Sequence, residues 1–308
     1  MSNIQASNGH GQMSIPAERS GRLPKPPWLK VRLPAHGNFF QVSDILKKNH
    51  LQTICQSARC PNIAECWTAR TATFLILGDT CTRSCGFCAV KKGTPLALND
   101  DEPSKVAEAV ESMGLDYAVV TSVTRDDFPD GGASVFARTI RAIKDRRPRA
   151  KVEVLVPDFG GSEEALAVVI AAGPEVLNHN LETTAPNYPR INRPAGNYGR
   201  SLAVLGKAGH LGALTKSGLM VGLGETEPEI DRAFQDLRSV GCRLLTIGQY
   251  LQPTRDNPPV SRYYSPEEFE ALKARALGLG FKEVASGPLV RSSYQAHRLY
   301  NSSAAGDA

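Results

Sequence analysis

Short apolar runs alternate with amphipathic segments along most of the chain. Seven runs of four to six residues have the character of buried strands: 74–77, 117–121, 151–156, 176–180, 216–221, 243–247 and 281–285. Between them, apolar residues recur at helical spacing in the segments 104–113, 135–143, 162–172, 199–209, 227–240 and 266–280. This alternation predicts a mostly parallel sheet with right-handed crossovers. Because about six strand–helix units are fewer than the eight of a closed TIM barrel, we expect an α/β fold with a partial (β/α)6 barrel, open on one side.

Local signals set the ends of several helices. Ser104 is predicted to cap the first of them, and Gly114 to end it. Gly173-Pro174 stops another helix. The helix that begins after Pro266 and stops near Gly280 is predicted to be the last.

The two ends of the chain depart from the alternating pattern. We expect a barrel over 73–286 with an extension on each side, at 28–72 and at 287–308, the latter ending in a flexible tail. Residues 1–27 are polar or rich in proline and are predicted to be a disordered tail. Trp28 and Leu29 are expected to anchor this tail on the core. The apolar spacing over 40–54 predicts one short helix.

Composition narrows the class of protein. The 308 residues are 41% hydrophobic and 22% charged, which is enough apolar material for one sizeable core. No apolar run approaches the ~20 residues of a membrane span, and the amino terminus has no apolar core of a secretory signal. We therefore predict a cytoplasmic protein with no membrane partner, although Arg19, Arg22 and Lys25 leave an organelle-targeted form open.

The net charge of +5 is moderate, and the basic residues gather most densely near the middle of the chain. This basic stretch comprises Arg138, Arg141, Lys144, Arg146, Arg147, Arg149 and Lys151. It is either a solvated helix face or a docking surface for an acidic protein. Aromatic residues are not interleaved with it, so no nucleic-acid partner is expected.

Three cysteines lie in one loop just after the first apolar run, at Cys81, Cys85 and Cys88. Thiolates are soft ligands that select zinc, Cu(I) or iron–sulfur clusters. Structural zinc sites usually take four protein ligands, so three thiols leave one metal position open. A zinc knuckle or loosely packed buried thiols are the alternatives.

A second group of cysteines precedes the first, with the spacing C-x4-C-x5-C at Cys55, Cys60 and Cys66. Six of the seven cysteines thus lie in two triplets within 55–88, a density that packing alone does not produce. Clustered triplets without a secretion signal favour metal binding over disulfides. Cys242 stands alone before an apolar run and is interpreted as a small buried hydrophobe.

The C-x3-C-x2-C spacing, followed by alternating strands and helices, resembles the radical S-adenosylmethionine (SAM) superfamily. In that superfamily SAM chelates the open iron of a [4Fe-4S] cluster through its amino and carboxylate groups. The reduced cluster cleaves SAM to methionine and a 5′-deoxyadenosyl radical.

A more specific resemblance extends over most of the chain, from about Trp28 to Tyr294. Besides the two triplets it rests on the motifs Ala58–Asn62, Thr121–Val123, Arg125–Asp127, Asn178–Thr183, Lys216–Thr226, Gly248–Thr254 and Gly287–Tyr294. With these motifs the chain resembles the lipoyl synthases. The residues that depart from the family's usual pattern are Gly86, Ala89, Thr124 and Gln295, none of which is a cluster ligand.

The resemblance implies a sulfurtransferase that inserts sulfur at C6 and C8 of an octanoyl group, giving the lipoyl cofactor. The substrate would be an octanoylated lysine of a lipoyl carrier domain. Two [4Fe-4S] clusters would be present, with SAM as co-substrate. A ferredoxin or flavodoxin would supply electrons, and a separate Fe–S repair protein would restore the cluster that is consumed.

The resemblance also implies a ligand set. Cys81, Cys85 and Cys88 would hold the cluster that cleaves SAM, while Cys55, Cys60, Cys66 and Ser292 would hold the second cluster, whose sulfides are inserted. In lipoyl synthases the first serine of the Arg-Ser-Ser-Tyr motif is the fourth ligand. From the residues alone, Ser292 would be interpreted as a cap or an exposed turn.

The polar residues at strand ends are the candidate SAM contacts. By resemblance, Thr121 and Ser122 would meet the methionyl amino end, Glu182 the ribose or sulfonium side, and the loop that contains Gly222 and Glu225 the adenine. Asn180 is a further candidate for SAM binding. Structural alternatives remain for two of them. Glu182 could instead pair with Arg190 or Arg193, and Gly222 could serve only a tight turn.

Two other functions stay open at the level of sequence. One is a different radical SAM enzyme with an auxiliary cluster, such as a biotin-synthase-like enzyme, which would not need the C-x4-C-x5-C group or the terminal serine motif. The other is a non-enzymatic iron–sulfur carrier, whose cluster spectrum would not change with SAM.

Overall fold

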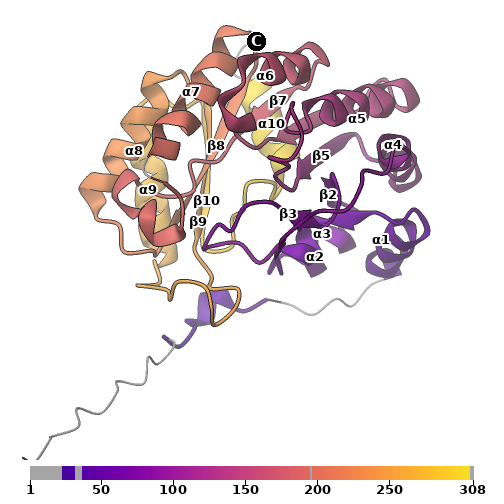
Figure 1. Cartoon of the computed structure of the whole chain (residues 1–308). Coiled ribbons are helices and arrows are strands. Elements are labelled where there is room, and N and C mark those ends of the chain that lie inside the picture. The colour runs from indigo at the N-terminus through magenta and orange to yellow at the C-terminus, as the bar shows by residue number, and fades with distance from the viewer. Residues whose placement is uncertain (1–22, 32–36, 195, 306–308) are drawn as a thin grey trace, which may run out of the picture.

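Figure 1 shows a computed structural model of the chain, which describes residues 23–31, 37–194 and 196–305. At its centre is a sheet whose strands lie in the order β1-β2-β5-β6-β7-β8-β9-β10. Their bounds are β1 (Gln52–Thr53), β2 (Thr73–Ile76), β5 (Tyr117–Ser122), β6 (Lys151–Leu155), β7 (Val176–Asn178), β8 (Thr215–Val221), β9 (Leu244–Gln249) and β10 (Glu283–Gly287). Only β1 runs antiparallel to its neighbour. The other neighbours are parallel, and β1 and β10 form the two edges, which confirms a partial barrel open on one side.

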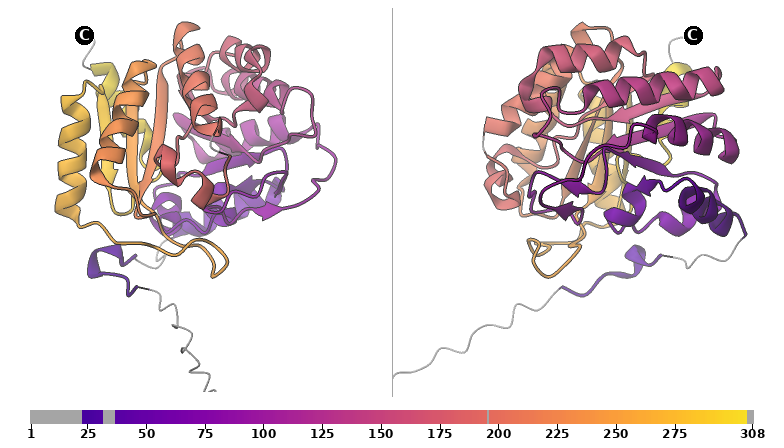
Figure 2. Two further views of the ribbon diagram at one scale, coloured as in Figure 1. Left: turned by 60° about the vertical axis from the view of Figure 1, so that its left-hand side comes forward. Right: turned by 45° about the vertical axis from the view of Figure 1, so that its right-hand side comes forward.

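The helices that connect the parallel strands form the outer layer around the sheet (Figure 2). They are α4 (Glu102–Met113), α5 (Ala133–Arg146), α6 (Glu163–Ala171), α7 (Gly196–His210), α8 (Glu227–Ser239) and α9 (Pro266–Gly278). Each coincides with a predicted segment. Ser265 begins α9 with a capping box to Glu268, which explains why the helix starts at the expected proline.

The start of α4 differs from the prediction. Its N-cap is Asp101, and Ser104 lies within the first turn, where its Oγ donates to the carbonyl oxygen of Asp101 at 2.8 Å. Pro103 is tolerated in that first turn because the amide it lacks has no intrahelical partner there. Gly114 ends the helix in the left-handed conformation, as predicted.

The amino-terminal extension contains three short helices where one was predicted: α1 (Gly37–Lys48), α2 (Ile54–Ser57) and α3 (Ile63–Thr68). Thr53 caps α2, its Oγ1 accepting from the amide of Gln56, so the chain turns there instead of continuing one helix. The anchoring prediction is confirmed, since Leu29 is buried and the Trp28 indole donates to the Tyr264 carbonyl oxygen at 3.2 Å. The predicted disorder falls largely on residues 1–22, which lie outside the described residues.

The predicted flexible tail is wrong over α10 (Ala296–Ala305), a helix that follows the Arg-Ser-Ser-Tyr motif. Leu299 of α10 packs with Val176 and Leu244, the first residues of β7 and β9. Tyr300 stacks near Tyr117, with ring centroids 5.7 Å apart. The helix therefore closes the amino-terminal end of the barrel, and the sequence signal for it was the apolar spacing of Ala296, Leu299 and Tyr300.

A buried ion pair joins strands β6 and β8 inside the barrel. Lys216 Nζ is 2.8 Å from Glu153 Oε1, and each side chain is 1% exposed. Tyr117 donates its hydroxyl to the other oxygen of Glu153 at 2.8 Å. The barrel interior is therefore polar well below its carboxyl end.

The basic stretch is largely paired with acidic residues of neighbouring elements. Arg146 of α5 reaches Glu108 and Glu111 of α4, both at 2.9 Å. Further ion pairs in this region are Arg138–Asp100, Lys144–Glu175 and Arg147–Asp116. These contacts favour a structural role that fastens α4 to α5, and the docking role stays a prediction. Within the described ranges, the chain forms no helix of the length and apolar character needed to cross a membrane.

Candidate functional site

The first cysteine loop begins in β3 (Thr80–Cys81), beyond the carboxyl end of β2. Its three thiols, at Cys81, Cys85 and Cys88, are half-buried. Cys81 Sγ accepts from the amides of Arg83 at 3.4 Å and Thr124 at 3.3 Å, and Cys88 Sγ accepts from the amide of Val90 at 3.5 Å. Amides directed at sulfur stabilise a thiolate, and such hydrogen bonds help to set the potential of iron–sulfur ligands.

The pKa of the Cys88 thiol is raised to about 11, mainly by burial and in part by negative charge on Cys85 and Cys81. Burial likewise raises the pKa of Cys85, with Glu182 and Cys81 acting in the same direction. Thiols that repel one another in this way lie close together. They ionise readily only when a cation is among them, and iron would supply it.

The second cysteine group lies in the gap between the two edges of the sheet. Cys55 is in α2, Cys66 is in α3, and Cys60 lies between these helices. The pKa of Cys66 is raised to about 12, mainly by burial and in part by the charges of Cys55 and Cys60. Cys55 is buried and Cys60 and Cys66 are half-buried, so this triplet is also a cluster of neighbouring thiols.

The Arg-Ser-Ser-Tyr motif follows β10 and packs against the second group from the opposite edge of the sheet. Ser293 Oγ accepts from Thr73 Oγ1 at 2.8 Å, and the Tyr294 hydroxyl donates to Glu65 Oε1 at 2.7 Å. Arg291 lowers the pKa of Cys60 through its charge, although burial of that thiol is the larger effect and raises it. The motif therefore closes the gap beside the second thiol group.

Ser292, the predicted fourth ligand, points its hydroxyl at Asn180. Asn180 Nδ2 donates to Ser292 Oγ at 2.7 Å, and Ser292 Oγ donates to Asn180 Oδ1 at 3.0 Å. A Cβ on Gly218 of β8 would lie 2.6 Å from Asn180 Oδ1 and 3.0 Å from Ser292 Oγ. Only glycine leaves room for this pair.

In the described part of the chain, no three His, Cys, Asp or Glu side chains converge closely enough to hold one metal ion. A four-iron cluster held by three thiolates binds each of them on a different iron, so its ligands are spread further apart than those of a single ion. The cluster and the zinc-knuckle interpretations of the two triplets both stay predictions.

The two predicted contacts at the end of β5 differ in their availability. Thr121 is buried, and its hydroxyl donates to the carbonyl oxygen of Leu155 on β6 at 2.9 Å. The Ser122 hydroxyl is buried without a hydrogen-bond partner among the described residues. A buried orphan hydroxyl is a candidate for a ligand contact. Ser122 is therefore the better candidate of the two.

Glu182 lies close to the first cysteine loop and to a buried arginine. Burial raises its pKa to about 7, opposed by the charge of Arg193. Arg193 is 9% exposed, and its guanidinium lies 5.2 Å from the ring centre of Tyr188. No hydrogen bond to this guanidinium is found among the described residues. The effect of the Arg193 charge on the pKa of Glu182 supports the alternative in which these two side chains pair. The guanidinium N–H groups of Arg193 nevertheless stay free to donate to a further acceptor.

A cavity of about 710 Å³ adjoins the first cysteine loop, and its walls include Cys85, Arg83, Asn192, Arg193 and Arg200. Arg193 was not among the site residues expected from the sequence. It follows a turn and carries no motif signal of its own, so only the fold shows that it lies beside Cys85. Its position on this cavity makes it a candidate for an anionic group of a ligand.

Gly222 and Glu225 make hydrogen bonds within their own turn. The Glu225 carboxylate accepts from the amides of Gly222 and Leu223 and from the Tyr264 hydroxyl. Gly222 has a φ of 104°, and a Cβ there would lie 2.2 Å from Gln249 Nε2. These contacts favour the tight-turn interpretation, and the role of either residue in adenine binding stays a prediction.

An open parallel barrel with three thiols beyond its first parallel strand defines the class of radical SAM proteins, and the Radical SAM superfamily model matches residues 75–237. The lipoyl synthase of Rubrobacter xylanophilus is 55% identical over 282 residues, which are 91% of this chain and 88% of the relative. The lipoyl synthase of Caldicellulosiruptor bescii is 54% identical over 89% of this chain and 94% of its own. The chain therefore belongs to the lipoyl synthase family.

Solved structures with low sequence identity confirm the fold. Methylornithine synthase matches with a TM-score of 0.54 at 12% identity, over 82% of this chain and 84% of that one. A maturase of the [FeFe]-hydrogenase matches with a TM-score of 0.55 at 16% identity, over 86% and 67%. Membership of the superfamily implies one [4Fe-4S] cluster and SAM.

Proposed function

We propose that this protein inserts sulfur at C6 and C8 of an octanoyl group held on a lysine of a lipoyl carrier domain. The observation that carries the proposal is the presence of two separate groups of buried thiols, one of them bordered by the Arg-Ser-Ser-Tyr motif. An alkyl C–H bond is far too weak an acid for any tuned side chain, so the protein's own residues bind and orient the reactants.

Cys81, Cys85 and Cys88 would hold a [4Fe-4S] cluster, which supplies the electron that cleaves SAM. The surrounding side chains suit the polar groups of SAM. The orphan hydroxyl of Ser122 suits the amino end, and the Glu182 carboxylate suits the ribose or the sulfonium. Arg193, with free N–H groups facing the cavity, suits the carboxylate. Each polar end of SAM thus has a complementary partner, and Glu182 and Arg193 both act on the thiol of Cys85 through their charges.

Cys55, Cys60, Cys66 and Ser292 would hold a second [4Fe-4S] cluster, which would be the source of the inserted sulfur. Asn180 positions the Ser292 hydroxyl through two hydrogen bonds. A hydroxyl oxygen is a harder ligand than a thiolate and matches iron–sulfur chemistry less well. The iron held by Ser292 would therefore be the most weakly bound.

Family membership favours this function over the two alternatives from sequence. A biotin-synthase-like enzyme needs neither the C-x4-C-x5-C group nor the serine motif, yet the segments that carry them pack together here. An iron–sulfur carrier would not need an orphan hydroxyl and an unpaired guanidinium near its thiols. A ferredoxin or flavodoxin reductant, a cluster-repair protein and a cytoplasmic location stay predictions.

The direct test is an anaerobic incubation of the reconstituted protein with SAM, dithionite and an octanoyl-lysine peptide, followed by mass spectrometry. We expect a product that carries two added sulfur atoms, together with methionine and 5′-deoxyadenosine. SAM cleavage without any thiolated peptide would contradict the proposed function and favour a different radical SAM enzyme. A protein whose cluster spectrum ignores SAM would instead favour the carrier.

A further inference from the structure

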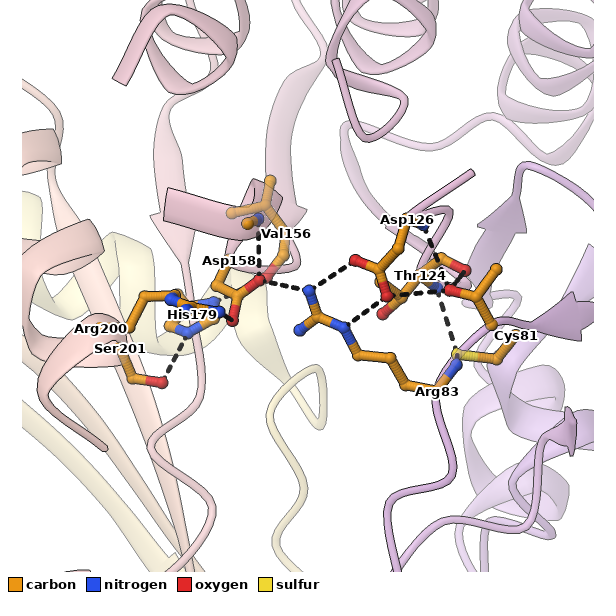
Figure 3. Close-up of polar contacts among 11 residues, drawn as sticks. Cys81, Arg83, Thr124, Asp126, Val156, Asp158, His179, Arg200 and Ser201 are labelled. Atoms are coloured by element: carbon orange, nitrogen blue, oxygen red, sulfur yellow. Dashed lines mark hydrogen bonds and ion pairs between the residues drawn. The ribbon is translucent and has the colours of Figure 1, made fainter. Parts of the chain in front are cut away.

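One arginine of the first cysteine loop is held between two carboxylates, as Figure 3 shows. Arg83 donates through Nε and Nη2 to the two oxygens of Asp126, at 2.8 and 2.7 Å. The same Nη2 donates to Asp158 Oδ1 at 2.7 Å. Asp126 is 44% exposed, whereas the Asp158 side chain is completely buried. The two ion pairs therefore differ in how far water screens them.

The two carboxylates belong to loops that follow neighbouring strands of the barrel. Asp126 comes after β5 and Asp158 comes after β6, so Arg83 fastens the cysteine loop to the carboxyl ends of both strands. The preceding residue adds to this attachment, since the Thr82 amide and hydroxyl both donate to the Thr124 carbonyl oxygen, at 3.1 and 3.0 Å. The Thr124 amide in turn donates to Cys81 Sγ. The attachment therefore includes a hydrogen bond to the Cys81 thiol.

Asp158 is ionised in this environment. Burial would raise its pKa, but the hydrogen bond and charge of Arg83 and the amide of Gly160 hold the pKa at about 2. Arg200 of α7 adds a weaker contact, 3.6 Å from Asp158 Oδ2. The neighbouring His179 is neutral, since burial lowers its pKa to about 4 while Nδ1 faces the Val156 carbonyl oxygen and Nε2 faces the Ser201 hydroxyl. Arg83 is thus the main positive partner of Asp158.

We propose that Arg83 is a positioning residue whose buried ion pair with Asp158 fixes the Cys81–Cys85 segment in the shape that receives a cluster. Asp126 is a secondary brace. The inference rests on the proposed function in taking Cys81, Cys85 and Cys88 as the ligands of the SAM-cleaving cluster. Removal of one partner from a buried pair leaves an uncompensated charge and is strongly destabilising, whereas an exposed pair contributes little. The two carboxylates should therefore differ in their effect on the loop.

The test compares Asp158→Asn, Arg83→Gln and Asp126→Asn with the reconstituted wild type under anaerobic conditions. The SAM-responsive cluster is the one whose electron paramagnetic resonance signal changes when SAM is added. The measured quantity is the rate at which a chelator removes this cluster. We expect loss to be faster by about tenfold or more in Asp158→Asn and Arg83→Gln, and by less than about threefold in Asp126→Asn. The double variant Arg83→Gln/Asp158→Asn should lose the cluster more slowly than the product of the two single effects predicts, because neither charge is left alone.

A second measurement separates positioning of the loop from general stabilisation of the fold. Removal of a negative charge near the cluster should raise its midpoint potential, and removal of a positive charge should lower it. Asp158→Asn and Arg83→Gln should therefore shift the potential in opposite directions. The matched control is Arg146→Gln, which also breaks two ion pairs of an arginine, but on the outer helices. We expect it to change neither the rate nor the potential.

The inference fails if Asp158→Asn loses both clusters at equally raised rates, or if it retains the SAM-responsive cluster as wild type does. Either result would show that the network stabilises the fold or is dispensable, while the proposed function would stand. A wild-type protein without any SAM-responsive cluster would instead overturn the proposed function, and with it the ligand assignment on which this inference depends.

Discussion

At the scale of single residues, the site consists of thiols whose chemistry is set by what surrounds them. Burial and mutual repulsion raise the pKa values of Cys66 and Cys88. Arg193 and Ser122 lie nearby with free hydrogen-bonding capacity. The thiols would bind iron, and the polar residues would bind SAM. These tasks can be separated by substitution.

The two cysteine triplets should have separate roles. Cys85→Ala is expected to abolish SAM cleavage, because the SAM-binding cluster cannot assemble on two thiolates. Cys60→Ala should retain some reductive SAM cleavage and lose all sulfur insertion. Chromatography of 5′-deoxyadenosine and mass spectrometry of the peptide measure the two activities, and wild type should carry about eight irons per chain. Equal loss of cleavage in both variants would refute the division of roles.

Arg193→Ala should weaken SAM binding. The guanidinium is nearly buried and has no hydrogen-bond acceptor of its own within the described residues, so a carboxylate that meets it gains a strong charge-assisted bond. We expect the Kd for SAM to rise by about tenfold or more, since a hydrogen bond to a charged group contributes about 1.5–3 kcal/mol. The measurement is a titration of the cluster spectrum with SAM. Arg200→Ala, on the same cavity but 41% exposed, is the matched control. An effect in the control as large as that in Arg193→Ala would contradict the assignment.

At the scale of elements, the barrel was predictable because its signals are local. The parallel strands of the eight-stranded sheet overlap the apolar runs of the sequence, and turn and cap residues bound the helices, as Gly114 does. The extensions were harder to predict, because α2 and α3 are too short for periodicity to show. The cysteines of the site were predictable from their spacing. Arg193 was not, because its role depends on a fold that brings it to Cys85.

The helix α10 should contribute to stability by closing the amino-terminal end of the barrel. Leu299→Ala is expected to lower the free energy of unfolding of the cluster-free chain by about 2–4 kcal/mol, through lost burial and the cavity left behind. Urea denaturation followed by circular dichroism measures the change. Leu277→Ala on α9, where the leucine is 40% exposed, should cost less than about 1 kcal/mol. Similar costs for both substitutions would show that α10 packs only loosely.

At the scale of the whole molecule, one short segment connects the two thiol groups. Asn180 hydrogen-bonds Ser292 beside the second group. Two residues later, Glu182 raises the pKa of Cys85 and Cys88 in the first group through its charge. The loop after β7 therefore lies between the two proposed clusters. An octanoyl chain that passes this loop would be within reach of both the radical and the sulfur.

If the proposed second cluster supplies the sulfur, the protein would be a source of sulfur as well as a catalyst, and its turnover would be limited. If both sulfurs come from the cluster that Ser292 completes, one chain should make no more than about one lipoyl group until a separate system restores the cluster. Clusters rebuilt with heavy sulfide should place two labelled sulfurs in one product molecule, measured by mass spectrometry with unlabelled sulfide in solution. Ser292→Ala should still cleave SAM but give little or no lipoyl product. Ser292→Cys should assemble a cluster yet stall, because a thiolate holds iron more firmly than a hydroxyl oxygen does. Many unassisted turnovers, or product sulfur drawn from free sulfide, would rule out this source.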